Sequence, residues 1–445
     1  MNARTDVHIP TRTPFFTPGS SVIAAVALLG GIVLLYRFAF GLGATTNLSD
    51  AYPWGLWIAI DVACGVALAA GGFTTAFIVH ILHRERYHPL LRPALLTAMI
   101  GYTFVALGVA TDLGRFWAMW HVMLPTMWQP NSVLFEVAIC VMIYVNVLYI
   151  EFLPVVCERF MGKVHLPGPL ARLDHTVERV LHVLDATLGR VITVFVVLGV
   201  VLSCMHQSSL GTLMVIAAGK LDPLWHTPLL PLLFLLSAFA VGLPMVIVES
   251  LIASRSFKLP PERTALSSIA RIIPWLLFAY LIVKIGDLFF RGVLPRLLEG
   301  STISAFLIAE VAFGVVLPIV IFSIPTLRRS MPWLFAGAAL VVLGVVLNRL
   351  NVFLIGYSPL DATASYVPAW TEFAVTAGFL AMMVLIYRAV ALNFAVIEHL
   401  GPSPSKETAA EQLHETKSPS ARPAIAPRQP TPRPAPAAYA NAQRR

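Results

Sequence analysis

Long apolar stretches alternate with shorter polar segments along the chain, and they set the predicted architecture. A helix needs about 20 mostly apolar residues to cross the hydrocarbon of a bilayer. The stretches that reach this length are 22–41, 55–80, 94–113, 132–154, 187–205, 228–252, 270–290, 303–324, 332–350 and 370–394. The pattern therefore predicts an all-α fold, a polytopic transmembrane helical bundle of about ten spans.

The composition agrees with a membrane protein. Of the 445 residues, 58% are hydrophobic and only 12% are charged, and the mean hydropathy is +0.78. Soluble domains carry about 25% charged residues. A soluble globular domain is thereby excluded, and membrane lipid is the expected surrounding of the spans.

Basic residues gather in alternate connections between the expected spans. The basic set holds Arg4, Arg12, Arg84, Arg86, Arg92, Arg159, Lys163, Arg172, Arg179, Arg190, Arg255, Lys258, Arg263, Arg271, Arg328, Arg329 and Arg388. The opposite set holds little beyond Arg115, Lys220, Arg291 and Arg296. The positive-inside rule therefore predicts that both termini are cytoplasmic. The net charge of +8 then reflects topology, and no nucleic-acid partner is expected.

Three segments are expected outside the spans. Residues 1–21 form a cytoplasmic N-terminal segment, and the apolar run after it continues too far for a signal peptide, so a retained helix is favoured. Residues 158–186 carry charges at helical spacing and predict a cytoplasmic connector near the membrane surface. Residues 396–445 are rich in Pro and Ala and predict a disordered cytoplasmic tail. The transmembrane domain is thus expected over 22–395.

The sequence offers no familiar grouping of metal ligands. The four cysteines are Cys64, Cys140, Cys157 and Cys204, and iron–sulfur clusters and structural zinc need thiolates much closer together. The histidines lie at expected span ends or in connections, so no pair faces another at mid-membrane depth. We therefore expect no metal site, no haem and no iron–sulfur cluster in this chain.

Polar residues concentrate at the predicted outer ends of the spans. The segment SCMHQSSLGTL (203–213) places His206 and Gln207 there, and Glu136 begins the fourth span. The other members of this outer group are Asp61, Asp112, Arg115, Trp120 and His121. Ionisable groups within a membrane usually pair or line a functional cavity.

Each of these residues also has a structural interpretation. Asp112 with Arg115, and Lys284 with Asp287, have the spacing of helical ion pairs. The tryptophans are typical of an interfacial belt, and the polar run at His206 is typical of a helix end that turns through a polar loop. Glu136 has no basic residue nearby in sequence, which favours a proton carrier.

A quinone fits an aromatic-flanked, partly apolar pocket of this kind. Its carbonyl oxygens need hydrogen-bond donors, and its reduction needs protons. His206 could bond one carbonyl, and Glu136 or Asp112 could relay protons.

Several long motifs resemble a known family. They are PWGLWIAIDVACGVALAAGGF (53–73), YHPLLRPALL (87–96), GYTFVALGVATDLGRFW (101–117), NSVLFEVAICVMIYV (131–145), MHQSSLGTLM (205–214) and PLW (223–225). Over residues 20–395 the chain is similar to the HybB branch of the NrfD and polysulfide-reductase membrane-subunit family.

The resemblance implies a haem-free helical subunit that exchanges electrons between menaquinone or ubiquinone and a periplasmic, ferredoxin-like iron–sulfur subunit. It implies the small and large subunits of a [NiFe] hydrogenase as further partners, the bacterial inner membrane as location, and proton translocation in some members. The quinone region would contain His206 as quinone ligand, Glu136 as proton relay, Asp112 with Arg115 as pocket wall, and Asp61, Gln207, Trp120 and His121 beside them.

Two alternatives stay open. Related subunits oxidise quinol for polysulfide, tetrathionate or nitrite reductases, so the partner and the direction of electron flow are undecided. Ten spans with buried charges would also suffice for a secondary transporter or ion channel, but a transporter predicts broken helices near the midplane and internal symmetry. The concentration of charges at one face disfavours a transporter.

Overall fold

The computed structural model describes residues 14–165, 167–217, 219–359, 365–394 and 396. Every element below belongs to one compact unit within Met1–Glu398. The predicted tail at 396–445 lies outside the described residues except for residue 396, as does the predicted N-terminal segment before residue 14.

Ten helices of the described residues are long and apolar enough to cross a membrane, so the predicted all-α polytopic fold is confirmed. The first six spans are α1 (Pro18–Phe40), a second span built from η2 (Trp57–Cys64), α2 (Gly65–Leu68), α3 (Ala70–Ala76) and η3 (Phe77–Ile81), α4 (His88–Asp112), α5 (Val133–Phe160), α6 (Asp174–Val215) and α7 (Leu230–Phe257). The last four are α8 (Arg263–Ile269) with α9 (Ile273–Phe290), α10 (Thr302–Val311) with η9 (Ala312–Val316) and α11 (Leu317–Ser323), α13 (Met331–Leu350) with η10 (Asn351–Ile355), and α14 (Trp370–Asn393).

Short helical turns lie in the connections. They are η1 (Leu42–Ala44), η4 (Glu85–Tyr87), η5 (Phe116–Met123), η6 (Pro125–Met127), η7 (Gly168–Leu173), η8 (Leu294–Leu298) and α12 (Pro325–Arg329).

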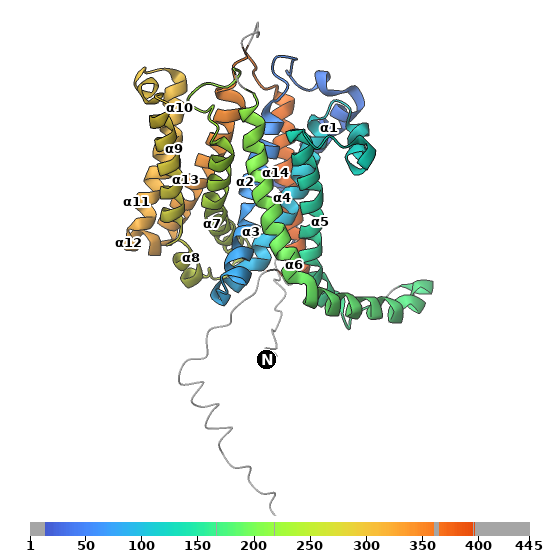
Figure 1. The fold of residues 1–445 in the computed structure, drawn as a ribbon. Coiled ribbons are helices and arrows are strands. Elements are labelled where there is room, and N and C mark those ends of the chain that lie inside the picture. Colours follow the sequence, from blue (N-terminus) through green and yellow to red (C-terminus); the bar gives the residue numbers. More distant parts are fainter. Residues whose placement is uncertain (1–13, 166, 218, 360–364, 395, 397–445) are drawn as a thin grey trace, which may run out of the picture. The chain divides into compact units, whose positions relative to one another are not determined.

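The fifth span differs most from its predicted limits. The sequence placed this span at 187–205, but α6 is one helix from Asp174 to Val215. Residues 174–186 of the expected connector therefore continue directly into the span, and the polar run 206–213 is helical. Figure 1 shows the start of α6 (green) extending sideways before the helix turns into the bundle.

The second span and α7 form the centre of the bundle. In the second span 83% of the most apolar window is buried, against 17% in α1. The second span packs against α4, α6 and α7, and α7 also packs against α9 and α13 (Figure 1). One hydrophobic core joins the second span to α4, α5, α6 and α14, and another joins α7 to α9 and α13.

The connections fall at two ends of the bundle. We call the end with the described parts of connections 41–56, 113–132, 216–229, 291–301 and 356–369 the loop end. The opposite end is called the basic end, because the described members of the predicted basic set lie there. At the loop end, Asp222 donates its amide hydrogen to Gly356 O (2.8 Å) and Ser358 donates to Lys220 O (2.7 Å). At the basic end, Arg388 of α14 donates to the carbonyls of Pro14 and Phe15. The first described residues and the end of α14 are therefore on the same side, as an even number of spans requires.

Candidate functional site

His206 is held inside α6, well before the helix ends at Val215. Its side chain is fully buried, and both ring nitrogens lack a hydrogen-bond partner. The ring of Tyr102 from α4 lies 5.5 Å away between centroids. The interpretation of this segment as a helix end in a polar loop is therefore wrong. The imidazole is an unpaired polar group of a kind that costs a few kcal/mol to bury, about 2–7 on transfer scales.

Tyr102 belongs to a small aromatic group beside His206. Its ring meets Tyr144 of α5 edge to face at 4.5 Å, and its hydroxyl lies 3.5 Å from Ser203 Oγ of α6. Tyr102, Tyr144 and Ser203 are all buried. The imidazole thus sits where α4, α5 and α6 meet.

Glu136 of α5 lies across the α5–α6 contact from Ser209, which follows His206 by about one helical turn of α6. Ser209 of α6 donates its hydroxyl hydrogen to Glu136 Oε1 over 2.6 Å. Residues three apart lie on the same face of a helix. His206 and Ser209 are therefore on the same face of α6, His206 beside Tyr102 of α4 and Ser209 beside Glu136 of α5. The structure thus places Glu136 and His206 near each other without direct contact.

Gln207 faces the other side of α6, toward the second span. Its Nε2 donates to the carbonyl of Val66 over 2.8 Å, and its Oε1 is buried without a partner. Gln207 therefore links α6 to the middle of the second span.

Asp61 and Asp112 belong to a separate group nearer the loop end. Asp61, in η2, accepts a hydrogen bond from Thr376 of α14 (2.8 Å) and interacts electrostatically with Asp112. Asp112 interacts in turn with Glu372, and its Oδ1 is buried without a hydrogen-bond partner. We call Asp61, Asp112 and Glu372 the carboxylate cluster.

The cation beside this cluster is Arg37, not Arg115. Arg37 of α1 is fully buried and donates to Thr111 O and Leu113 O, each over 2.7 Å. Arg115 is exposed, and no ion pair among the described residues joins it to Asp112. The interpretation of Asp112 and Arg115 as an ion pair is therefore wrong.

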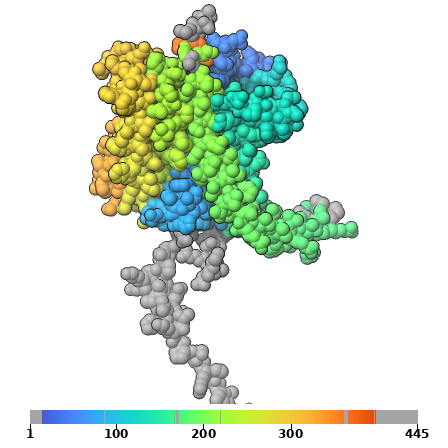
Figure 2. Space-filling view, viewed as in Figure 1, coloured from blue at the N-terminus to red at the C-terminus, as the bar shows by residue number. Residues whose placement is uncertain are grey.

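Trp120 and His121 lie in η5, on an exposed segment of the loop end. Their rings contact each other at 4.5 Å, and 54% of Trp120 is exposed. Within the described residues, no ring contact or hydrogen bond joins either residue to His206 or Glu136. Figure 2 shows this segment (teal) protruding at the surface of the upper part of the view. These two residues are not brought to the His206 region.

The sequence did not single out Arg37, Tyr102 or Tyr366 as site residues. Tyr366 donates its hydroxyl hydrogen to Glu372 Oε2 and lies just before α14. Burial and this hydrogen bond raise the pKa of the Tyr366 hydroxyl, so the phenol keeps its proton. Arg37 could have been found from the sequence, because it is an arginine within the apolar stretch of the first span. The partners of Tyr102 and Tyr366 come from distant segments and leave no local pattern.

A second buried polar network lies between α9, α10 and α13. Lys284 approaches Glu310 to 3.7 Å, and both side chains are at most 3% exposed. Asp287 pairs with Arg291 at 2.7 Å and accepts from Thr227 at 2.6 Å. The interpretation of Lys284 with Asp287 as a pair is therefore wrong, because each residue has another partner.

Metal ligands do not cluster in the part of the chain that the structure describes. No group of three or more His, Cys, Asp or Glu residues could hold a metal ion there. The cysteines of the described segments are free thiols. The expected absence of metal and iron–sulfur sites stays a prediction.

Three curated relatives are similar to most of the chain. "Probable Ni/Fe-hydrogenase 2 b-type cytochrome subunit" of Escherichia coli is 33% identical over 80% of this chain and 86% of that protein. A protein of Nitratidesulfovibrio vulgaris is 32% identical over 88% of this chain and 98% of its own length. "Menaquinone reductase, integral membrane subunit" of the same organism is 28% identical over 82% of this chain and 87% of its own length.

The name of the Escherichia coli relative corrects one expectation. A b-type cytochrome is a haem protein, so this name contradicts the prediction that the chain holds no haem. The prediction depended on placing every histidine outside the spans, and His206 instead lies inside α6. Among the described histidines His206 alone is fully buried, and its free ring nitrogens fit one axial ligand of a haem iron. No second histidine ring of the described part contacts it.

The family is shown by a match that covers most of the membrane domain. Residues 44–360 match the family described as "Polysulphide reductase, NrfD". This range includes His206, Glu136 and most of the spans. The three relatives likewise match the chain over most of its length. The chain therefore belongs to the NrfD family of polytopic membrane proteins.

Proposed function

We propose that this chain is the quinone-binding membrane subunit of a respiratory [NiFe] hydrogenase in a bacterial inner membrane. Electrons would arrive from a periplasmic, ferredoxin-like iron–sulfur subunit, itself served by the hydrogenase small and large subunits, and would reduce menaquinone or ubiquinone. The names of two relatives support this assignment, one a hydrogenase subunit and the other a menaquinone reductase subunit.

The observation that carries the proposal is the state of His206. A fully buried imidazole with two unpartnered ring nitrogens is costly unless a ligand completes its hydrogen bonds. In a neutral imidazole one nitrogen donates and the other accepts. The donating nitrogen can bond a quinone carbonyl, and the aromatic rings of Tyr102 and Tyr144 give the site the apolar walls that a quinone ring needs.

Proton supply follows from the Glu136–Ser209 hydrogen bond. Reduction of a quinone to a quinol takes two electrons and two protons. Glu136 lies in the first turn of α5, near the loop end. Its hydrogen-bond partner Ser209 lies on the same face of α6 as His206. Glu136 therefore provides the proton-exchanging group between the loop end and the buried imidazole.

A haem at His206 would supply a one-electron carrier between the partner subunit and the quinone. His206 would then act on the haem instead of on a quinone carbonyl. His206 would be the residue that holds the haem, and Tyr102 and Tyr144 would exclude water.

The test is substitution of His206 in the complete complex. His206→Ala should abolish hydrogen-dependent quinone reduction while hydrogen-dependent dye reduction by the partner subunits persists. His182→Ala is the matched control, because it removes an exposed histidine from the same helix. Normal quinone reduction by His206→Ala would overturn the proposal. A haem absorption signal present in the parent and lost only in His206→Ala would identify the imidazole as an axial ligand.

A reductase partner is the second candidate function. The family description names polysulphide reductase, and in that setting quinol would be oxidised and electrons would leave the membrane. Mass spectrometry of the proteins that co-purify in mild detergent separates the two. A nickel-containing large subunit supports the hydrogenase, and a molybdenum-type oxidoreductase supports the alternative.

A further inference from the structure

A cavity of about 420 Å³ lies at the basic end of the bundle, away from His206. It is enclosed by the beginning of α1, α4, the last turns of α7 and the last turns of α14. Its volume falls in the range of ligand pockets, about 300–1,000 Å³. Nothing in the proposed function uses this space.

The cavity wall carries two neighbouring polar groups, Glu249 of α7 and Tyr387 of α14, whose side chains interact with each other. Glu249 Oε1 of α7 and Tyr387 Oη of α14 both line it, and neither makes a hydrogen bond. The two side chains approach each other, and Glu249 also approaches Thr97 of α4, but Glu249 Oε1 and Tyr387 Oη have no hydrogen bond of ordinary geometry. Because each unpaired buried polar group costs free energy, a ligand with hydrogen-bonding atoms would stabilise both.

Most of the remaining wall is apolar, with Thr17, Ser20, Thr97, Ser256 and Arg388 as its further polar residues, and the apolar part reaches the lipid-facing surface. Met245 and Met383 line the interior, and Ile252, Leu380 and Val384 line the cavity with 51–54% of each residue exposed. A ligand can therefore enter sideways from the hydrocarbon of the bilayer and leave an apolar tail between α1, α7 and α14.

The charges at the cavity disfavour an ionic head group. Arg388 is the cation in the wall, and its three nitrogens already donate to Phe15 O, Ser256 Oγ and Pro14 O. No free cation of the described lining residues is left to pair with a phosphate or carboxylate, and Glu249 would repel one. The head group that fits is uncharged and carries oxygen atoms.

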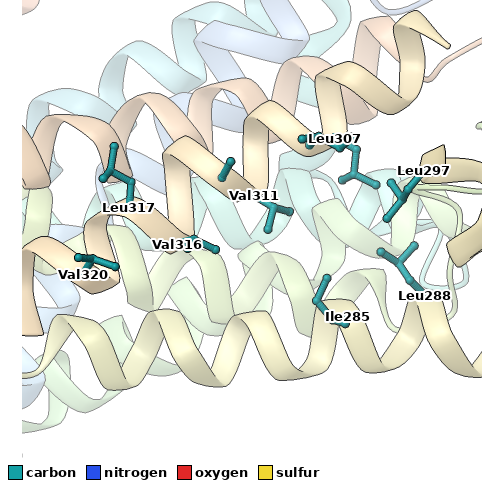
Figure 3. A pocket seen from close by; sticks show the side chains of 10 residues that line it. Ile285, Leu288, Leu297, Leu307, Val311, Val316, Leu317 and Val320 are labelled. Atoms are coloured by element: carbon teal, nitrogen blue, oxygen red, sulfur yellow. The ribbon is translucent and has the colours of Figure 1, made fainter. Parts of the chain in front are cut away.

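A second cavity, between α9 and α10–α11, lacks the polar side chains that line the cavity at the basic end. That cavity has a volume of about 360 Å³ and is lined by aliphatic side chains such as Leu288, Val311 and Leu317 (Figure 3). The sticks in Figure 3 carry carbon alone. Such a space can hold an acyl chain but has no side-chain group to orient a head.

From these observations we infer that the Glu249–Tyr387 cavity is a second amphiphile site, which binds an uncharged lipid whose head carries carbonyl or hydroxyl oxygens. Quinones and diacylglycerols both supply this chemistry. The inference goes beyond the proposed function, because it concerns binding at the basic end and stands whatever the role of His206.

The test is photoaffinity labelling of the full complex in lipid nanodiscs with an azido-ubiquinone of short isoprenoid tail. Label should map to residues 245–256 and 380–388, and Met383→Trp, which fills the cavity, should abolish that label. The double variant Glu249→Gln with Tyr387→Phe changes volume little and should weaken labelling about tenfold, as expected for a lost hydrogen bond. Leu317→Trp fills the aliphatic cavity of Figure 3 and is the matched control that should leave labelling unchanged.

Competition identifies the source of the ligand. Excess unlabelled ubiquinone or excess diacylglycerol should each be tried, and displacement by either supports the site and names its ligand. Label confined to α5 and α6, or label that survives both Met383→Trp and the double variant, overturns the inference. Displacement by an anionic phospholipid alone also overturns it. His206→Ala should leave this label intact, so failure of the proposed function and failure of this inference are distinguishable.

Discussion

Glu310 shows how a single charged residue is tolerated in the apolar interior. Its carboxylate accepts hydrogen bonds from Trp225 Nε1, Tyr280 Oη and the side-chain amides of Asn348 and Asn351, at 2.7–3.4 Å. Lys284 adds the compensating charge. A buried ion needs this full set of partners, because solvent is not there to replace any of them.

Removal of one partner of this pair should therefore be costly. Lys284→Met should destabilise the protein by about 3–5 kcal/mol, because it leaves Glu310 buried without its counter-charge. The measurement is thermal unfolding in detergent. The double variant Lys284→Met with Glu310→Gln should recover part of the lost stability, and a double variant that is less stable than Lys284→Met would refute the pairing.

Glu136 is the residue on which proton delivery depends in the proposed function. Glu136→Gln keeps the hydrogen-bond acceptor for Ser209 but cannot exchange a proton at physiological pH, so quinone turnover should fall by about 10²–10⁴-fold while the complex still assembles. Steady-state hydrogen:quinone activity and subunit composition measure the two effects. Glu178→Gln, in the exposed first turns of α6, is the control that should keep full activity. An unchanged rate in Glu136→Gln would remove it from the proton path.

The residue-level expectations failed where partners are distant in sequence. The run HQSS after an apolar stretch has the polarity of a helix end, yet α6 continues because Gln207 finds Val66 O and Ser209 finds Glu136. Likewise Asp112 has Arg37, 75 positions away, as its nearby cation instead of Arg115. Spacing along one helix cannot reveal such contacts between helices.

Helix packing at the element scale depends on small residues. Where α1 crosses α14, a Cβ added to Gly30 would lie 2.4 Å from Gly378 Cα, and one added to Gly378 would lie 2.6 Å from Gly30 Cα. Small residues allow this close approach of helices within a membrane. The two helices could not keep this distance with any larger side chain at either position.

Gly30→Leu should accordingly separate α1 from α14 and destabilise the protein by about 1–3 kcal/mol, as overpacking does. The adjacent Gly31 has nothing within 4 Å of its added Cβ, so Gly31→Leu is a matched control with the same change on the same helix. Thermal unfolding of both variants gives the comparison. Equal stability of the two variants would contradict the close contact.

Element number was predictable and element ends were not. Ten spans follow from apolar length alone, because the hydrocarbon thickness sets a minimum length for each. The ends depend on capping and on contacts beyond the membrane. Ser132 and Ser301 cap α5 and α10 through their side chains, whereas α6 begins at Asp174 inside a stretch whose polarity indicated a separate connector.

The whole molecule separates its charges between two ends. The carboxylate cluster and Arg37 lie toward the loop end, and the Glu249–Tyr387 cavity lies toward the basic end. The sequence predicted, from the alternation of basic connections, only that the basic residues gather at one end. The orientation of the two ends in the cell stays a prediction, since it follows from the positive-inside rule.

Cysteine labelling tests that orientation. Gly114→Cys at the loop end should react with a membrane-impermeant maleimide from the periplasmic side, and Thr326→Cys at the basic end should react only from the cytoplasmic side. Gly114 has open space around it and Thr326 is exposed. Three of the native thiols are buried and Cys204 is half-buried, so background labelling should be low. The reverse pattern would invert the topology.

The unbroken course of α6 has a mechanical consequence. At 42 residues this helix is about 63 Å long, twice the hydrocarbon thickness of about 30 Å. Each residue of a helix adds about 100° of rotation, so inserting or deleting one residue between the bend of α6 and His206 would turn the imidazole away from its present position. The segment 161–173 lies before α6, so a change in its length would not rotate the imidazole of His206. The exposed first turns of α6 are therefore continuous in hydrogen-bonded backbone with the turn that carries His206, although the helix bends where it enters the bundle (Figure 1), and a partner bound to those turns would be connected to the buried site through one helix.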